Sequence, residues 1–274
     1  MLKINKYSLI KNAAVLGVAS LSLSLIATSS SFSDGHIYGE NNPVTVKGYK
    51  GSKTDSTAYT GQMARQLQHN SLKKIVSKGN PSDPTSNTLN KMLNYFENKD
   101  KTKSMAILDP KSSSKFPVKQ KMVGEISTGS NLAGKADGRV QLSWPNNMTG
   151  ADVIRFMIKK ASKISGGVDM KNGMNYPQLI SKYTMGAVLY HQACDNYLDE
   201  KMTASNKPND KPYKKGAYYT GKEHSWDEAF GYWGAAAHTM TLSAQQSYDV
   251  AKKKDLKAAD FNKDGVVDLY KEMT

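Results

Sequence analysis

The sequence predicts an all-α fold, a helical bundle that carries one long irregular insertion. Apolar residues recur every three to four positions, as at Ala64, Leu67 and Ile75, which is the period of an α-helix. Glycine and proline clusters, such as the one from Gly79 to Pro81, separate these periodic segments. No convincing hairpin pattern interrupts them, so we expect helices to build the core.

Six helical segments are expected along the chain. The first two contain residues 64–75 and 89–96, and Thr149 caps a third helix that ends at Gly166-Gly167. A longer helix is expected from about Pro177 to Met202, and two more from about 225 to 237 and from about 238 to 254. Residues 99–148 are rich in Lys, Ser and Gly with little periodicity, which predicts a long loop or insertion.

Residues 1–29 have the pattern of a secretory signal peptide. Three lysines precede an uncharged stretch from Ala13 to Ala27, and small residues suited to cleavage after Ser29 follow it. This stretch has fifteen residues, fewer than the roughly 20 that cross a bilayer, so a membrane anchor is the weaker alternative. We therefore expect a periplasmic or secreted protein without a lipidation cysteine at the cleavage site. An exposed arm over residues 30–55 and a helical domain over residues 56–274 should follow.

The charge balance narrows the class of partner. The chain holds 38 lysines and arginines against 24 acidic residues, a net charge of +14, yet it has only three arginines. Nucleic-acid binding relies on the planar fork of arginine, so we do not expect a nucleic-acid partner. A lysine-rich surface suits weak attraction to acidic envelope polymers. The single cysteine, Cys194, cannot form an intrachain disulfide, so the core or a metal must stabilise an exported chain.

The C-terminal residues 260–272 resemble an EF-hand-type calcium loop. Oxygen ligands at alternate positions wrap a hard cation, and glycine at the sixth position makes the turn. The expected calcium ligands are Asp260, Asn262, Asp264, the carbonyl oxygen of Val266, Asp268 and Glu272. The twelfth position holds Lys271 in place of the usual bidentate glutamate, so either Asp268 closes the loop or Glu272 reaches in through a bulge. A metal-free Asn/Asp/Gly turn is the alternative.

The segment from His224 to Gly234 is predicted to be a helix with two different faces. At 100° per residue, one arc holds Trp226, Phe230 and Trp233. An aromatic arc of this kind is expected in the core. The opposite face holds His224, Asp227, Glu228 and Gly231, and its glycine allows a second helix or a ligand to come close.

The polar residues of this helix allow two interpretations. The spacing of His224, Asp227 and Glu228 can present a nitrogen and a carboxylate to one metal ion or one proton-transfer site. The structural alternative is a capping box formed by Ser225 and Glu228, with Asp227 placed favourably in the first turn.

The preceding helix carries a second pair, His191 and Asp195, four residues apart on an otherwise apolar face. The two side chains can satisfy each other as a buried pair. Alternatively, they converge with His224 and Glu228 on an iron or zinc ion in the bundle core. Cys194 is expected to be a small buried neighbour.

Three segments together resemble the bacterial exported family called domain of unknown function 4856. They are residues 56–65, residues 224–234 and the Asp-x-Asn-x-Asp-Gly loop, in that order. Members of that family usually continue past the calcium-type loop with further helices, so the resemblance implies a C-terminally truncated chain. It implies no activity.

More distantly, the chain is similar to imelysin-like proteins, helical bundles of the bacterial envelope linked to iron uptake. This resemblance implies an imelysin-like bundle. Their Gly-x-His-x-x-Glu motif differs by one residue in each spacing from Gly221, His224 and Glu228 of this chain.

Three functions remain open from these observations. The favoured one is an exported helical protein that binds a metal or small ligand, with a structural calcium loop. The second is a metal-dependent, peptidase-like hydrolase in which His224 and His191 bind zinc and Glu228 activates water. The chain lacks a His-Glu-x-x-His motif, which would have favoured this function, so whether it is an enzyme stays open. The third is a lysine-rich envelope interaction protein.

Overall fold

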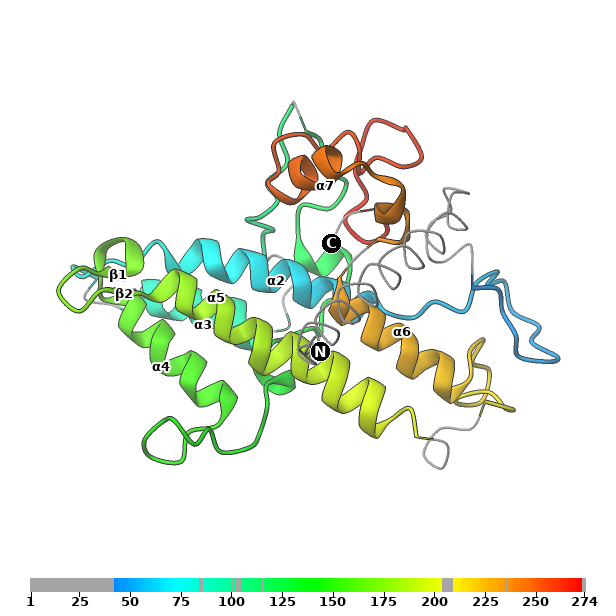
Figure 1. Ribbon diagram of the computed structural model, residues 1–274, viewed down its shortest axis with the longest axis horizontal. Coiled ribbons are helices and arrows are strands. Elements are labelled where there is room, and N and C mark those ends of the chain that lie inside the picture. The colour runs from blue at the N-terminus through cyan, green and yellow to red at the C-terminus, as the bar shows by residue number, and fades with distance from the viewer. Residues whose placement is uncertain are drawn as a thin grey trace, which may run out of the picture.

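The computed structural model describes residues 42–83, 86–99, 101, 105–114, 116–203, 209–234 and 236–272. The predicted signal peptide and residues 30–41 of the arm lie outside the described residues. The described chain is mostly helical, with six α-helices and one short hairpin (Figure 1). The helical prediction is therefore confirmed in its coarse form. The hairpin, which pairs β1 (Val168–Asp169) with β2 (Met174–Asn175), was not predicted because two-residue strands carry no periodicity.

Helix α2 (Thr60–Val76) is the central element of the bundle (Figure 1). Three helices pack against it along its length, namely α3 (Asn87–Glu97), α5 (Tyr176–Thr184) and α6 (Gly221–Trp233). The fourth neighbour, α4 (Gly150–Ser162), packs chiefly on α3 and α5. Because α2 is covered on several sides, most of its residues are buried, including Gln62, Gln68 and His69 among the polar ones.

Helix α5 continues without a break into η6 (Met185–Glu200), which has π-helical hydrogen bonding. The sequence predicts one long helix over this span, and the structure confirms one continuous helical rod there. A π-helix has a wider turn than an α-helix, so side-chain directions along η6 depart from the 3.6-residue period.

Two predicted helix N-caps can be compared with those in the structure. Thr149 caps α4 as expected, since its hydroxyl accepts a hydrogen bond from the N–H of Asp152. The predicted capping box of Ser225 and Glu228 is wrong. Helix α6 begins four residues earlier, where Thr220 and Glu223 form the capping box, and the hydroxyl of Ser225 donates to the carbonyl of Gly221 inside the helix.

The C-terminal helices also end differently from the prediction. Gly234 has φ +80° and ends α6 in a left-handed turn. The chain then forms the 3₁₀-helix η7 (Ala237–Thr241) and the short helix α7 (Ala244–Ala251). The predicted pair of helices over about 225–237 and 238–254 is thus replaced by three elements, α6, η7 and α7, because this glycine ends the first helix.

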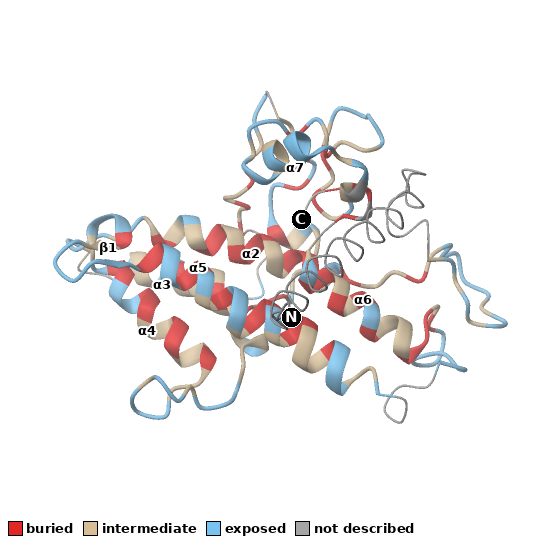
Figure 2. Ribbon diagram, viewed as in Figure 1, coloured by how far each residue is buried: buried red, intermediate tan, exposed pale blue. Residues whose placement is uncertain are grey.

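The buried residues form two clusters, which Figure 2 shows on either side of α2. The larger cluster lies among α2, α3, α4, α5, η6 and α6. The smaller one joins Ala64 and Leu67 of α2 to two distant segments, residues 105–123 and residues 256–269. A backbone bridge between Val118 and Val267 links these two segments directly. We call residues 105–123 and 236–272 together the C-terminal lobe.

Part of the predicted 99–148 insertion therefore belongs to a core. It contains no α-helix among its described residues and instead forms the 3₁₀ turns η3 (Val123–Glu125) and η4 (Ala133–Lys135). None of the helices described is long and apolar enough to cross a membrane.

Candidate functional site

Helix α6 presents the face opposite to the one predicted. Trp226 is 51% exposed and Trp233 is 75% exposed, so the prediction that this aromatic face lies in the core is wrong. The buried face carries small and polar residues instead, together with Tyr232. A Cβ on Gly231 would lie 2.6 Å from Cβ of Gln62, which shows how closely α6 approaches α2. The expectation that glycine admits a second helix on this face is confirmed, because a side chain at position 231 would collide with α2.

The two carboxylates of α6 tie it to the elements around it. Asp227 is 3% exposed and accepts a hydrogen bond from the backbone N–H of Ala58. Glu228 accepts one from the amide of Gln62 at 2.7 Å, and its other oxygen lies 3.6 Å from Nε2 of His224. Both carboxylates thus have structural partners. The partner of Asp227 lies just before α2, and the partner of Glu228 lies within α2.

Tyrosine rings pack against His224 and lie near Glu228. The ring of His224 packs against Tyr219, with centroids 4.7 Å apart, and against Tyr213 at 4.6 Å. On the other side, Tyr197 of η6 stacks on Tyr232 with centroids 5.9 Å apart. Burial raises the pKa of both Tyr197 and Tyr232, and the nearby negative charge of Glu228 raises each further. The phenols therefore stay neutral at physiological pH.

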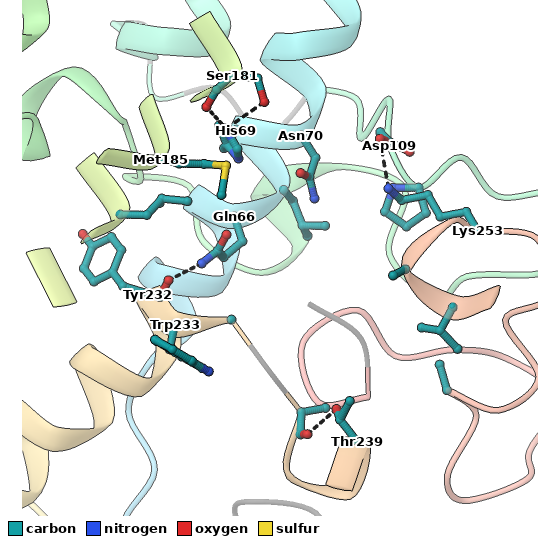
Figure 3. Close-up of a pocket in the computed structure, with 18 of the residues that line it drawn as sticks. Gln66, His69, Asn70, Asp109, Ser181, Met185, Tyr232, Trp233, Thr239 and Lys253 are labelled. Atoms are coloured by element: carbon teal, nitrogen blue, oxygen red, sulfur yellow. Dashed lines mark hydrogen bonds and ion pairs between the residues drawn. The ribbon is translucent and has the colours of Figure 1, made fainter. Parts of the chain in front are cut away.

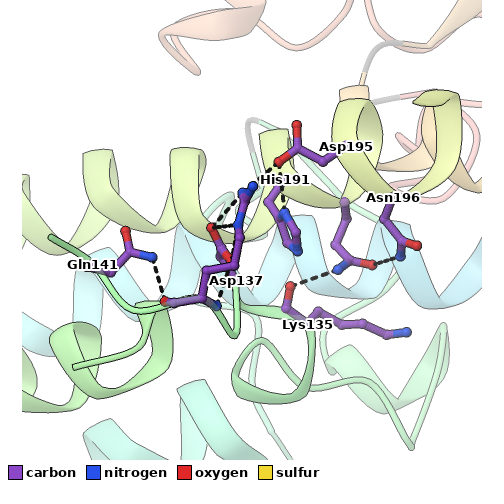
Figure 4. Close-up of polar contacts among 8 residues, drawn as sticks. Lys135, Asp137, Gln141, His191, Asp195 and Asn196 are labelled. Atoms are coloured by element: carbon purple, nitrogen blue, oxygen red, sulfur yellow. Dashed lines mark hydrogen bonds and ion pairs between the residues drawn. The ribbon is translucent and has the colours of Figure 1, made fainter. Parts of the chain in front are cut away.

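His191 and Asp195 pair with each other, as one of the two interpretations has it, but the pair is partly exposed and Arg139 joins it (Figure 4). Nδ1 of His191 lies 3.0 Å from a carboxylate oxygen of Asp195, which also accepts a hydrogen bond from Arg139 at 2.9 Å. Arg139 in turn pairs with Asp137, and this hydrogen bonding lowers the pKa of Asp137 to about 2. Across the described residues, no three or more His, Cys, Asp or Glu side chains stand where they could hold one metal ion.

The calcium-type loop is closed by its own side chains. Gly265 at the sixth position has φ +85°, and the carboxylate of Asp260 accepts hydrogen bonds from the N–H groups of Asp264 and Gly265. Glu272 is 4% exposed and accepts three backbone hydrogen bonds within the loop, from Phe261, Asn262 and Asp268. Glu272 thus reaches into the loop from the thirteenth position.

Asp268 of this loop is engaged by residues of the predicted insertion. Its carboxylate pairs with Lys119 at 2.9 Å and accepts a hydrogen bond from Gln120 at 2.8 Å. Burial of Asp268 works against its charge, but the hydrogen bonds from Gln120 and Lys119 outweigh it and lower its pKa. These contacts fasten the loop to the rest of the C-terminal lobe.

The main cavity lies between the helical bundle and the C-terminal lobe (Figure 3). Its volume is about 650 Å³. Helix α2 supplies one wall, α5 and η6 a second, the end of α6 a third and the lobe a fourth. The lining includes Gln66, His69, Asn70, Lys73, Asp109, Ser181, Lys182, Met185, Leu189, Cys194, Trp233, Leu242, Lys253 and Glu272.

Polar side chains from α2 face this cavity. Figure 3 shows Asn70 pointing from α2 into the space between the bundle and the lobe, while the Gln66 amide donates to the carbonyl of Tyr232. Nε2–H of His69 donates to the carbonyl of Ser181 at 2.9 Å. Burial lowers the pKa of His69, so the ring is neutral at physiological pH.

Sequence reasoning missed this cavity. A weak indication was present, because Gln66, Asn70 and Lys73 follow one another at i, i+4 and i+7 and place a polar stripe on one side of an amphipathic helix. Most residues of the other walls, however, lie more than a hundred positions away in the chain, and no local pattern reports their approach.

Comparison with known proteins identifies one family. A family model described as Domain of unknown function (DUF4856) matches residues 40–267. No curated protein and no solved structure matches the chain. The imelysin-like fold expected from the more distant resemblance therefore gains no support here.

Proposed function

The chain belongs to this family of unknown function, and we propose a role for it from the geometry of the cavity. We propose that it is an exported envelope protein that binds a small organic ligand in the cavity between the helical bundle and the C-terminal lobe. The single observation that carries this proposal is the cavity itself. Its volume of about 650 Å³ falls in the usual range of about 300 to 1,000 Å³ for ligand sites. Export rests on the signal-peptide pattern of residues 1–29.

The lining of the cavity supports a ligand with apolar surface. Leu189 and Leu242 lie in its walls, and Met185 and Trp233 are large apolar side chains left substantially exposed at it. Apolar side chains of this size gain free energy when a ligand removes them from water. A few polar groups, such as Asn70, stand among them, as in other small-molecule sites.

Fluorescence titration with the neutral aromatic probe N-phenylnaphthylamine tests the proposal on the mature protein. We expect saturable binding at one site, with a Kd that rises about tenfold in Trp233→Ala, because losing the ring contact costs about 1.4 kcal/mol. Trp226→Ala is the matched control, since Trp226 is an exposed tryptophan of the same helix that does not line the cavity. Its Kd should stay within about twofold of the wild type.

Two outcomes would contradict the proposal. One is the absence of saturable binding. The other is an equal loss in both tryptophan variants, which would show that the probe binds exposed apolar surface in general. Cys194 offers an independent check because it lines the cavity and is the chain's single cysteine. Bound probe should slow its reaction with a small thiol reagent.

A calcium ion in the loop of residues 260–272 is a second proposal, carried by a separate observation. The glycine turn and the alternate oxygen groups follow the EF-hand pattern. Asp260, Asn262, Asp264 and the carbonyl of Val266 would be its first ligands. Asp268 and Glu272 are engaged by Lys119 and by backbone N–H groups, so they would join only by exchanging those partners.

No observation favours the hydrolase over the binding protein. The His224–Glu228 pair is packed between tyrosine rings and Gln62, and the cavity described above does not include it. His191 is engaged separately by Asp195.

A further inference from the structure

Two lysines give one part of the cavity a positive charge. Lys73 of α2 and Lys182 of α5 both line it, and both lie close enough to His69 to lower the pKa of that ring, adding to the larger effect of burial. Neither lysine has an ion-pair partner among the described residues. His69 is neutral and adds no charge of its own.

The other charged groups that line the cavity have partners within the C-terminal lobe. Lys253 lies 3.1 Å from the carboxylate of Asp109, so these two charges cancel. Glu272 is buried, and its oxygens accept three backbone hydrogen bonds within the calcium-type loop. Among the described residues of the lining, Lys73 and Lys182 are therefore the charged groups without such a partner, and their two positive charges favour a negatively charged group in this part of the cavity.

Trp233 and Lys73 lie at different places along the cavity. Gln66 and Lys73 are seven residues apart on α2, which is about 10 Å along a helix. Gly234 packs on Gln66, since a Cβ there would lie 2.8 Å from its amide nitrogen, and this places the Trp233 end of α6 beside Gln66. The cavity thus has an aromatic end and a cationic end.

We propose that the cavity selects an amphiphilic anion: a small molecule with an aromatic or aliphatic body and one acidic group, such as a carboxylate or sulfonate. The apolar body would contact Trp233 and Met185, and the acidic group would lie between Lys73 and Lys182. This inference rests on the proposed function, because it specifies the ligand of the same site. Lysine suits the task, since it acts as a point charge without the planar geometry that arginine imposes.

Two probes that differ only in one acidic group test the inference on the mature protein. Anilinonaphthalene sulfonate and N-phenylnaphthylamine share one aromatic skeleton, and only the first carries a negative charge. We expect the double variant Lys73→Gln, Lys182→Gln to raise the Kd of the sulfonate about tenfold, while the Kd of the neutral probe changes less than about twofold.

A second double variant controls for net charge. Lys159→Gln, Lys163→Gln removes the same two charges from exposed positions on and just after α4 that do not line the cavity. It should leave the affinity for both probes unchanged. Circular dichroism and the Tm of each variant establish that all three proteins are folded alike.

The outcomes separate the two proposals. If the neutral probe binds in the Trp233-dependent manner but the cavity lysines have no effect on the sulfonate, the anion inference is overturned and the proposed function stands. If both lysine pairs weaken the sulfonate equally, the attraction comes from the basic surface as a whole and the inference is again overturned. If neither probe binds in a Trp233-dependent manner, both proposals fail.

Discussion

Gly231 shows how one missing side chain positions a helix. A Cβ at this position would lie 2.6 Å from Cβ of Gln62 and 2.9 Å from Cβ of Tyr59, both rigidly attached to backbone. Gly231→Ala must therefore push α6 away from α2, and we expect it to lower the free energy of unfolding by about 1 to 3 kcal/mol. Urea denaturation monitored by circular dichroism measures this change.

Gly186→Ala is the matched control for this substitution. Gly186 also lies within a helical segment, but nothing lies within 4 Å of a Cβ built there. Alanine is the better helix former, so we expect the control to be neutral or stabilising by up to about 1 kcal/mol. Equal stability losses in the two variants would show that the α2–α6 contact is looser than the structure indicates.

The segment before α4 is joined to η6 through Asp137. The N–H of Asp137 donates to the carbonyl of Ala187 at 2.7 Å, and its carboxylate pairs with Arg139, which also bonds Asp195 of η6. This network connects the end of the predicted insertion to the longest helical rod. It also accounts for His191, which completes the chain of contacts through Asp195.

The lowered pKa of Asp137 predicts a pH dependence. Its folded-state pKa is about 2 against a reference value of 3.8, so the charged form stabilises the fold above about pH 4, and this contribution is lost as the pH falls through about 2. Asp137→Asn should lower the free energy of unfolding by about 1 kcal/mol at neutral pH, a modest value because Arg139 is largely exposed and water screens the pair.

The measurement is urea denaturation of both proteins between about pH 7 and pH 2. The difference between wild type and Asp137→Asn should shrink as the pH falls. Asp199→Asn, at an exposed position of the same helical rod, should show no such trend. A constant difference across the whole pH range would contradict the assignment of stability to the Asp137 charge.

The C-terminal lobe contacts the helical bundle in two ways. It forms one wall of the cavity, and it shares a buried cluster with α2. A calcium ion bound to the folded loop of residues 260–272 would stabilise the lobe by mass action, by about 2.7 kcal/mol at a hundredfold excess over Kd. We expect added calcium to raise the Tm by about 5 °C or more in a chain of this length. Asp264→Ala should abolish the shift.

Asp169→Ala is the control for the calcium experiment. Asp169 begins another Asp/Asn/Gly turn, in which it accepts hydrogen bonds from Lys171 and Asn172, but this turn lacks the alternate oxygen pattern. Its calcium-dependent Tm shift should equal that of the wild type. A wild-type Tm that is unaffected by both calcium and chelator would mean that the loop is the metal-free turn.

Several features of the molecule follow from short stretches of sequence. The helical periods of α2 and α4, the cap at Thr149 and the stop at Gly234 all depend on contacts within about one helical turn. The capping box of α6 was predicted in the wrong place because two Ser/Thr-x-x-Glu patterns, starting at Thr220 and at Ser225, occur side by side. A bridge between Pro212 and Thr220 ends at the first residue of the pattern that forms the cap.

The local pattern of the chain was sufficient to predict a helical protein and the close approach of a helix at Gly231, and the resemblance of three segments to a known family identified the family. They were not sufficient to place α6 with its tryptophans outward, to separate His191 from His224 or to reveal the cavity. Each of these depends on residues far apart in the chain, as with Gln62 and Glu228, which are 166 positions apart. Periodicity reports which residues share a face, whereas only packing decides which face turns inward and what space remains between the elements.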